Sequence, residues 1–307
     1  MKKEHIEEEN NLKFHRVKPS FNVLLTVMFF VLGILTLLPV LFVIVISFSS
    51  EDSIARKGYS FFPESVSLDA YRYLLKSIDY IGHSFLISLA VMVVGTLLSL
   101  YLISTMGYVL SRKEFRYKKL YTMLIMIPMF FGGGLAASYV VNTQLFGLKD
   151  SFWALILPSA CSSWYILVMR TYFKNNIPEE IYEAAELDGA NAFHTFFRIV
   201  IPLSKPIFTA IGLFEAFAYW NSWYNALLYI SQEHKELYPL QYVLYSIQRN
   251  TEFMATNENI SGAVAGTLPT ESFRMAVVVI IIVPILITYP FFKRFFVKGM
   301  TDGAVKD

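Results

Sequence analysis

The sequence has few charged residues, a single cysteine and little that is typical of a soluble domain. Of its 307 residues, 16% are charged, 55% are hydrophobic and 16% are aromatic, and the mean hydropathy is +0.48. This balance excludes an ordinary soluble domain and is typical of an integral membrane protein. The single cysteine, Cys161, excludes a disulfide framework and a thiolate metal cluster. Because Cys161 lies in an apolar segment, we interpret it as a buried structural thiol.

The sequence also lacks the patterns of a self-sufficient motor or enzyme. It contains no Gly-x-x-x-x-Gly-Lys-Ser/Thr loop for nucleotide phosphates, so energy from ATP has to come from a partner chain. Its apolar segments carry no series of carboxylates and histidines of the kind that proton-coupled transporters use. We therefore predict that the chain is not an enzyme and that it binds no cofactor, metal or nucleic acid. The alternative is a secondary transporter or a membrane enzyme, and Glu215 is the only residue that supports it.

Six apolar segments are each long enough to cross a hydrocarbon core, which takes about 20 helical residues. They are Phe21–Phe48, Ser84–Met106, Leu120–Val141, Phe152–Thr171, Pro206–Ile230 and Phe273–Phe292. These segments predict an all-α integral membrane bundle of six spans over residues 21–298. We expect residues 1–20 and 299–307 to be tails. Between the last two spans, apolar residues at helical spacing over 240–247 predict a short amphipathic helix at the outer surface.

The distribution of lysine and arginine predicts the orientation of the spans. Most of the 26 basic residues lie in the two tails and in the second and fourth connections. Because basic residues accumulate on the cytoplasmic side of a membrane, both termini and the fourth connection, about residues 175–203, are predicted to be cytoplasmic.

The fourth connection contains the most informative pattern in the sequence, which is Glu183-Ala184-Ala185 followed by Gly189, Ile199 and Ile201-Pro202. At helical spacing, Ile177, Ile181, Ala184 and Ala185 share one face, and the two alanines leave that face shallow enough for the groove of a partner. The pattern therefore predicts a polar helix-turn-helix that docks onto a cytosolic protein.

The ends of these two helices are predicted from their capping residues. Asn176 is expected to cap the first helix, with Glu179 as the reciprocal half of a capping box. Gly189 permits the left-handed conformation that ends this helix, and Asn191 is expected to begin the next one.

The fifth span carries a polar stripe around Glu215, which lies near the middle of a core about 30 Å thick. On one continuous helix, small and polar residues would share an arc of the surface: Glu215, Ala218, Asn221, Ser222 and Asn225. They either line a water-filled translocation pathway or hold this span to a neighbour through hydrogen bonds, and both alternatives need the same inward face. The aromatic residues off this arc, Trp220, Trp223 and Tyr224, are expected to pack or to lie at the membrane interface rather than to stack on sugars.

The Glu-Ala-Ala loop, the cluster Trp220-Asn221-Ser222-Trp223 and the ending Lys298 to Lys306 together resemble the inner-membrane permeases of ABC importers. The resemblance is to their carbohydrate-uptake branch, which is MalG-like, and within it to LplC- or YtcP-like polysaccharide and oligosaccharide permeases. The sequence departs from the loop pattern at Ile201, where leucine is usual.

The resemblance implies the MetI-like type I importer fold with a cytoplasmic coupling helix. It also implies several partners in a bacterial inner membrane: a second homologous permease, two ATPase subunits that bind ATP-Mg, an extracytoplasmic solute-binding protein, a carbohydrate and membrane lipid. Glu183 is then expected to pair with a basic residue in an ATPase cleft. The coupling residues that it implies are Ile181, Glu183, Ala184, Ala185, Gly189, Ile199 and Pro202. Import of an oligosaccharide by alternating access is the expected function, and an amino acid, peptide or phosphate is the alternative solute.

Overall fold

The structure is a computed structural model that describes residues 19–76, 78–256 and 271–286. These residues are mostly helical, and apart from one isolated β-bridge between Ser49 and Val66 they form no strand pairing. The chain divides into two compact units. The described part of the first is residues 19–71 with 271–279, and that of the second is residues 72–76, 78–256 and 280–286. The predicted tails, except residues 19 and 20, which begin the first helix, and the last residues of the sixth span lie outside the described residues.

The first unit contains the long apolar helix α2, Pro19–Ser47, and the short helix α3, Glu51–Lys57. The α2 side chains are mostly exposed within this chain, as in Phe30, which fits a helix that meets lipid or another subunit. α3 begins at Ser50, whose hydroxyl accepts a hydrogen bond from the Ser53 amide. The Glu51 carboxylate then accepts hydrogen bonds from both the backbone amide and the hydroxyl of Ser272.

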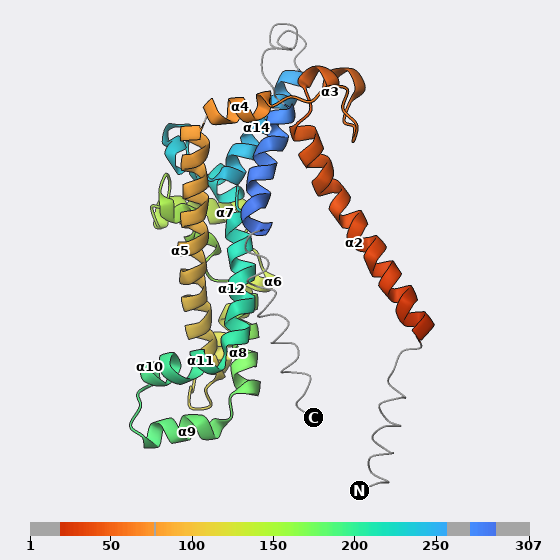
Figure 1. Ribbon diagram of the computed structural model, residues 1–307. Helices are drawn as coiled ribbons and strands as arrows, with labels where there is room; N and C mark the ends of the chain where they lie inside the picture. Colours follow the sequence, from red (N-terminus) through yellow and green to blue (C-terminus); the bar gives the residue numbers. More distant parts are fainter. Residues whose placement is uncertain (1–18, 77, 257–270, 287–307) are drawn as a thin grey trace. The chain divides into compact units, whose positions relative to one another are not determined.

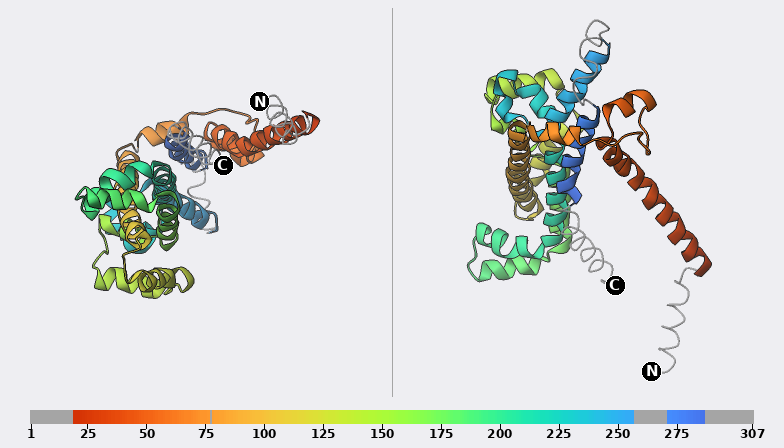
Figure 2. Two further views of the ribbon diagram at one scale, coloured as in Figure 1. Left: turned by 90° about the horizontal axis from the view of Figure 1, so that it is seen from below. Right: turned by 45° about the horizontal axis from the view of Figure 1, so that its top comes forward.

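The second unit is organised around α5, Ile78–Ser111. α8, Ser163–Asn176, and α12, Lys205–Trp220, both pack along it and run beside it in Figure 1 and Figure 2. At 1.5 Å per residue, its 34 residues are about 50 Å long. α5 is therefore longer than the predicted span Ser84–Met106 and continues beyond a hydrocarbon core at its ends.

Three of the predicted spans are interrupted and do not form single straight helices. The third consists of α6, Lys118–Phe130, then α7, Leu135–Val140, and the π-helical turn η1, Val141–Leu145, bent by 117°. Gly134 in this break has a φ of +81°, which explains why the helix cannot continue. Among the described residues, two helices are long and apolar enough to cross a membrane alone, or up to five spans if each bent pair counts as one.

The fourth span is bent as well, and the fifth follows a bend and is broken near its end. Two 3₁₀ turns, η2 at Phe152–Leu155 and η3 at Leu157–Ser159, precede α8 at an angle of 54°. Before α12 the chain forms α10, Ala192–Thr195, the π-helical turn η4, Phe196–Val200, and α11, Ile201–Leu203, which bend by 85° into α12. α12 ends at Trp220, and α13, Tyr224–Tyr229, follows after a break.

At the end of this unit where α5 begins lie η5, Gln232–Leu237, and α14, Leu240–Thr256. The predicted helix over 240–247 is confirmed with an apolar face, because Leu240 and Val243 are buried in the bundle, whereas its place at the outer surface stays a prediction. The Ser88 hydroxyl of α5 accepts a hydrogen bond from the Leu240 amide at 2.8 Å. α4, Asp69–Lys76, connects the two units along the chain.

Two apolar clusters hold the second unit together, one toward each end of α5. The first joins α5, α8, α9, η4 and α12 around Ile103, Met169, Phe173 and Val200. The second joins α5, η2, α12, α13 and α14 around Tyr219. Cys161 belongs to neither cluster. It is exposed, with its sulfur 3.6 Å from that of Met106, so its interpretation as a buried thiol was wrong.

Candidate functional site

The predicted docking helix is α9, Glu179–Leu187, which lies with α10 at one end of the second unit (Figure 1). Its predicted capping box was wrong. Asn176 is the last residue of α8, where its side-chain amide donates to the Tyr172 carbonyl, and Pro178 precedes α9 without a side-chain cap. Proline fits this place because its fixed φ suits the start of a helix and its missing amide hydrogen costs nothing there.

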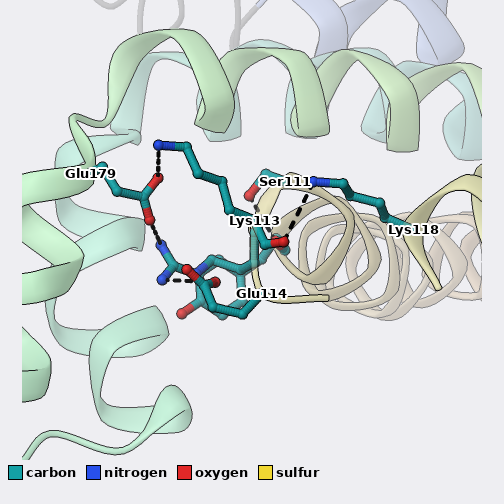
Figure 3. A network of polar contacts seen from close by, with 7 residues as sticks. Ser111, Lys113, Glu114, Lys118 and Glu179 are labelled. Atoms are coloured by element: carbon teal, nitrogen blue, oxygen red, sulfur yellow. Dashed lines mark hydrogen bonds and ion pairs between the residues drawn. The ribbon is translucent and has the colours of Figure 1, made fainter. Parts of the chain in front are cut away.

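Glu179 serves as an anchor instead of a cap. Its carboxylate lies 3.1 Å from the Arg112 guanidinium and 3.4 Å from the Lys113 ammonium (Figure 3). Arg112 directly follows α5 and also pairs with Glu114 at 3.1 Å. The first turn of α9 is thus held by an ion-pair cluster at the end of α5, about 70 residues away in the sequence.

Tyr182 forms the second anchor of α9, one turn after Glu179. Its ring is buried beneath the Arg112 guanidinium, whose carbon lies 3.7 Å from the ring centre. On the other side the ring meets Tyr108, which in turn packs against Phe196 of η4. Burial raises the pKa of the Tyr182 hydroxyl to about 12, although the nearby Arg112 charge opposes the rise. This hydroxyl has no hydrogen-bond partner among the described residues.

The face of α9 that is free to dock differs from the predicted one. Ile177 and Ala185 are buried against the rest of the bundle, and Ile181 packs partly into the same cluster. The exposed face contains residues at spacings of three and four: Glu180, Glu183, Ala184 and Leu187. Leu187 is 90% exposed, and sequence reasoning missed it because a leucine on a helix is usually part of the core.

The turn after α9 follows the prediction. Gly189 has a φ of +77°, and the Asn191 side chain accepts a hydrogen bond from the His194 amide at the start of α10. Of the two distal coupling residues, Ile199 is half-buried in η4 and Pro202 is exposed in α11. Phe193 of α10 is 73% exposed, a second apolar side chain that sequence reasoning did not identify.

The polar residues of the fifth span do not form the predicted single arc, because α12 ends at Trp220. Glu215 is 4% exposed, facing α5, where the Ser99 hydroxyl interacts with its carboxyl group. The same Ser99 hydroxyl lies 2.9 Å from that of Tyr219, which donates to the Ile156 carbonyl. These hydroxyl groups form a hydrogen-bonded cluster between α5 and α12, and Glu215 is buried beside it.

The remaining stripe residues separate into buried and exposed groups. Asn225 of α13 is buried and donates to the Leu155 carbonyl and the Ser159 hydroxyl. Ala218 and Asn221 are exposed within this chain, and the Asn221 amide oxygen accepts a hydrogen bond from Gln241. Ser222 is half-buried in the break between α12 and α13.

The aromatic residues near this break have different surroundings. Trp220 is buried, packs edge-on against Phe85 and donates to the Ile281 carbonyl, in agreement with its predicted packing role. Trp223 stacks on Tyr245 of α14 with the ring centres 4.3 Å apart, and Tyr224 is exposed. In the described part of the chain, no three acidic, histidine or cysteine side chains gather where they could hold a metal ion.

Known proteins are similar to this chain in sequence and in fold. The chain is 37% identical over 275 residues to Protein LplC of Bacillus subtilis (strain 168), covering 89% of this chain and 90% of LplC. It is 36% identical over 286 residues to the polygalacturonan/rhamnogalacturonan transport system permease protein YtcP of the same bacterium, covering 93% of this chain and 98% of YtcP.

A solved structure of a bacterial ABC transporter involved in the import of the acidic polysaccharide alginate contains a similar chain. The TM-score is 0.77 at 26% identity, with 92% of this chain and 99% of that chain covered. The predicted all-α permease fold is thereby confirmed. Residues 107–302 match the family described as binding-protein-dependent transport system inner membrane component. Since this match covers more than half of the sequence, the chain belongs to that family of membrane transport subunits.

Proposed function

We propose that this chain is the permease subunit of an ATP-driven importer that carries an oligosaccharide into the cell by alternating access. The observation that carries the proposal is α9, which is anchored on one face by Glu179 and Tyr182 and presents carboxylates and Leu187 on the other. A helix held firmly to its own bundle and exposed on one side is suited to receive force from a partner.

The substrate class is supported by what the similar proteins are named for. YtcP is named for polygalacturonan and rhamnogalacturonan, and two further relatives, at 27% and 25% identity, for arabinooligosaccharides. The structural neighbour is described as importing alginate. These are all carbohydrates, whereas no amino acid, peptide or phosphate occurs in those names. We accordingly favour an oligosaccharide over the alternative solutes.

The proposed mechanism assigns transmission and half of the pathway to this chain. Two ATPase subunits bind ATP-Mg and close on each other, α9 and its counterpart on a second permease move together, and the bundles rotate as rigid bodies to open outward. A solute-binding protein outside the membrane delivers the sugar. Within this scheme both termini and the loop 175–203 are cytoplasmic. In the same scheme we assign the exposed residues Ala218 and Asn221 to the lining of the route. We assign the buried Glu215 and Asn225 and the half-buried Ser222 to the support of its wall.

The test is solute uptake by the complete importer in proteoliposomes. The chain would be purified with its genomic partners and supplied with ATP inside the vesicles. Galacturonan, arabinan and alginate oligosaccharides would be compared with amino acids, short peptides and phosphate. We expect saturable, ATP-dependent uptake of one oligosaccharide class only. Uptake of an amino acid, peptide or phosphate instead would overturn the substrate class, and uptake without ATP would overturn the ATP-driven mechanism.

A further inference from the structure

The chain connections on either side of α9 do not fix its direction relative to the bundle. Before it, Ile177 and Pro178 are extended, with ψ of 108° and 146°. After it, Gly189 adopts a left-handed conformation. Short non-helical links of this kind are where proteins absorb changes in φ and ψ when one element moves against another. Movement of α9 would therefore be partly lost in these links if nothing else joined it to the bundle.

Arg112 provides another connection, and it reaches α9 at two points. One nitrogen lies 3.1 Å from the Glu179 carboxylate, and the guanidinium carbon lies 3.7 Å from the centre of the Tyr182 ring. Glu179 and Tyr182 are three residues apart and so lie on the same face of α9. A flat guanidinium can pair with a carboxylate along its edge and stack on a ring with its face, whereas a lysine ammonium cannot do both. The Arg112 side chain is only 19% exposed, which strengthens both contacts.

α5 is built to pass on a displacement that it receives at Arg112. Near this end, Gly107 lets it approach the α8 backbone closely, and farther along Gly95 does the same against the Tyr219 ring of α12. Toward the opposite end of α5, the Ser88 hydroxyl accepts a hydrogen bond from the Leu240 amide of α14. α5 is thus one continuous helix with close contacts at both ends of the unit.

We propose that Arg112 is the positioning residue that makes α5 follow α9, so that displacement of the docking loop reaches the far end of the bundle. The proposal rests on the proposed function, because it requires an ATPase to move α9. It assigns Arg112 no contact with the solute or with ATP.

The test measures whether α5 and α9 move as one body in the complete importer. Spin labels would be attached to cysteines at Leu97 of α5 and Glu186 of α9, both exposed, in a Cys161→Ser background. Distances would be compared without nucleotide and with nucleotide trapped by vanadate. With Arg112 present, we expect one narrow distance distribution that is the same in both states. In Arg112→Gln we expect the distribution to broaden and to shift between states, with a loss of uptake per ATP hydrolysed.

Matched variants separate this role from a general loss of stability. Tyr182→Phe keeps the ring and should behave like the wild type, whereas Tyr182→Leu should resemble Arg112→Gln. Arg112→Lys should give a distance distribution between those of the wild type and Arg112→Gln, because it keeps the charge and loses the stacking. Lys113, which is 72% exposed, should tolerate Lys113→Gln. In the double variant Arg112→Gln with Glu179→Gln, the two losses should not add, since both remove the same contact.

The outcomes also separate this inference from the proposed function. If no ATPase co-purifies and no uptake occurs even in the wild type, the proposed function fails. If the wild-type importer works and Arg112→Gln keeps both its narrow distance distribution and its uptake per ATP, the role of Arg112 is refuted. Charge exchange, Arg112→Glu with Glu179→Arg, should restore part of the distance behaviour, which a purely local folding defect would not allow.

Discussion

A Cβ atom added to Gly107 of α5 would lie 2.7 Å from the Cβ of Met169 in α8 and 3.1 Å from the Arg170 amide nitrogen. The neighbouring atoms belong to backbone or to a Cβ, so they cannot rotate away as the end of a flexible side chain could. The two helices cross at this point with no room for even a methyl group. Close approach through a glycine is a common way for membrane helices to associate, because it maximises van der Waals contact.

We expect Gly107→Ala to destabilise the bundle by about 1–3 kcal/mol, the usual cost of overpacking a close contact. The matched control is Gly82→Ala in the same helix, where nothing lies within 4 Å of the added atom. That control should be neutral or slightly stabilising, because alanine favours a helix by about 1 kcal/mol over glycine. Thermal unfolding of the two variants in detergent checks the difference. Equal melting temperatures would mean that the helices can separate at no cost.

The second prediction concerns the exposed face of α9. Glu183→Lys should greatly reduce ATP-driven uptake without preventing membrane insertion, because a reversed charge would meet a basic groove, at several kcal/mol if the contact is desolvated. Leu187→Ala should weaken ATPase association, because a side chain that is 90% exposed makes few contacts within this chain and is free to contact a partner. Co-purification of the ATPase and uptake are the measurements. Glu233→Lys, which reverses the same charge at an exposed position of η5 far from α9, serves as the control. Full uptake by the Glu183→Lys variant would contradict the docking face.

The third prediction separates pathway from packing in the fifth span. In a Cys161→Ser background, single cysteines at Ala218 and Asn221 should react with a water-soluble thiol reagent, and their reactivity should change when nucleotide is trapped. Cysteines at Glu215 and Asn225 should stay unreactive, since both side chains are buried between helices. Labelling rates in membranes give the comparison. Inert cysteines at Ala218 and Asn221 in every state would place these residues against another protein surface and not in the route.

The fourth prediction is a pH effect at the connection between η1 and η2. The Ser231 backbone amide donates to Asp150 at 2.6 Å, and this bond holds the pKa of that carboxyl below its ordinary value. The bond therefore stabilises the folded state above the ordinary carboxyl pKa of about 3.9, and the contribution is lost as the pH falls through the lower folded pKa. Asp150→Asn keeps a residue that tolerates the positive φ of this position.

Melting temperatures of the wild type and Asp150→Asn should accordingly differ near neutral pH and converge in acid. A difference that is constant from neutral to strongly acidic pH would show that the Asp150 charge contributes nothing through Ser231.

Local features of this chain could be predicted from sequence, and features set by distant residues could not. Gly189 and Asn191 were identified because a left-handed turn and a helix cap depend on single residues. The exposed face of α9 was predicted wrongly because Arg112, far away in the sequence, helps to decide which side is covered. The arc through Glu215 and Asn225 assumed an unbroken helix, and no helical period can foresee that the chain breaks after Trp220. Inside α12 itself, the inward position of Glu215 was predicted correctly, whereas Ala218 of the same arc is exposed.

The hydrogen-bond pattern of η4 determines how the docking loop is rotated about its helix axis. In this π-helical turn the Ile201 amide donates to the Phe196 carbonyl, five residues back instead of four. Rewinding the turn to an α-helix would release one residue and rotate α10 by about 100° against α12, because each α-helical residue turns by that angle. A change in this winding would therefore turn the docking loop in steps of one residue.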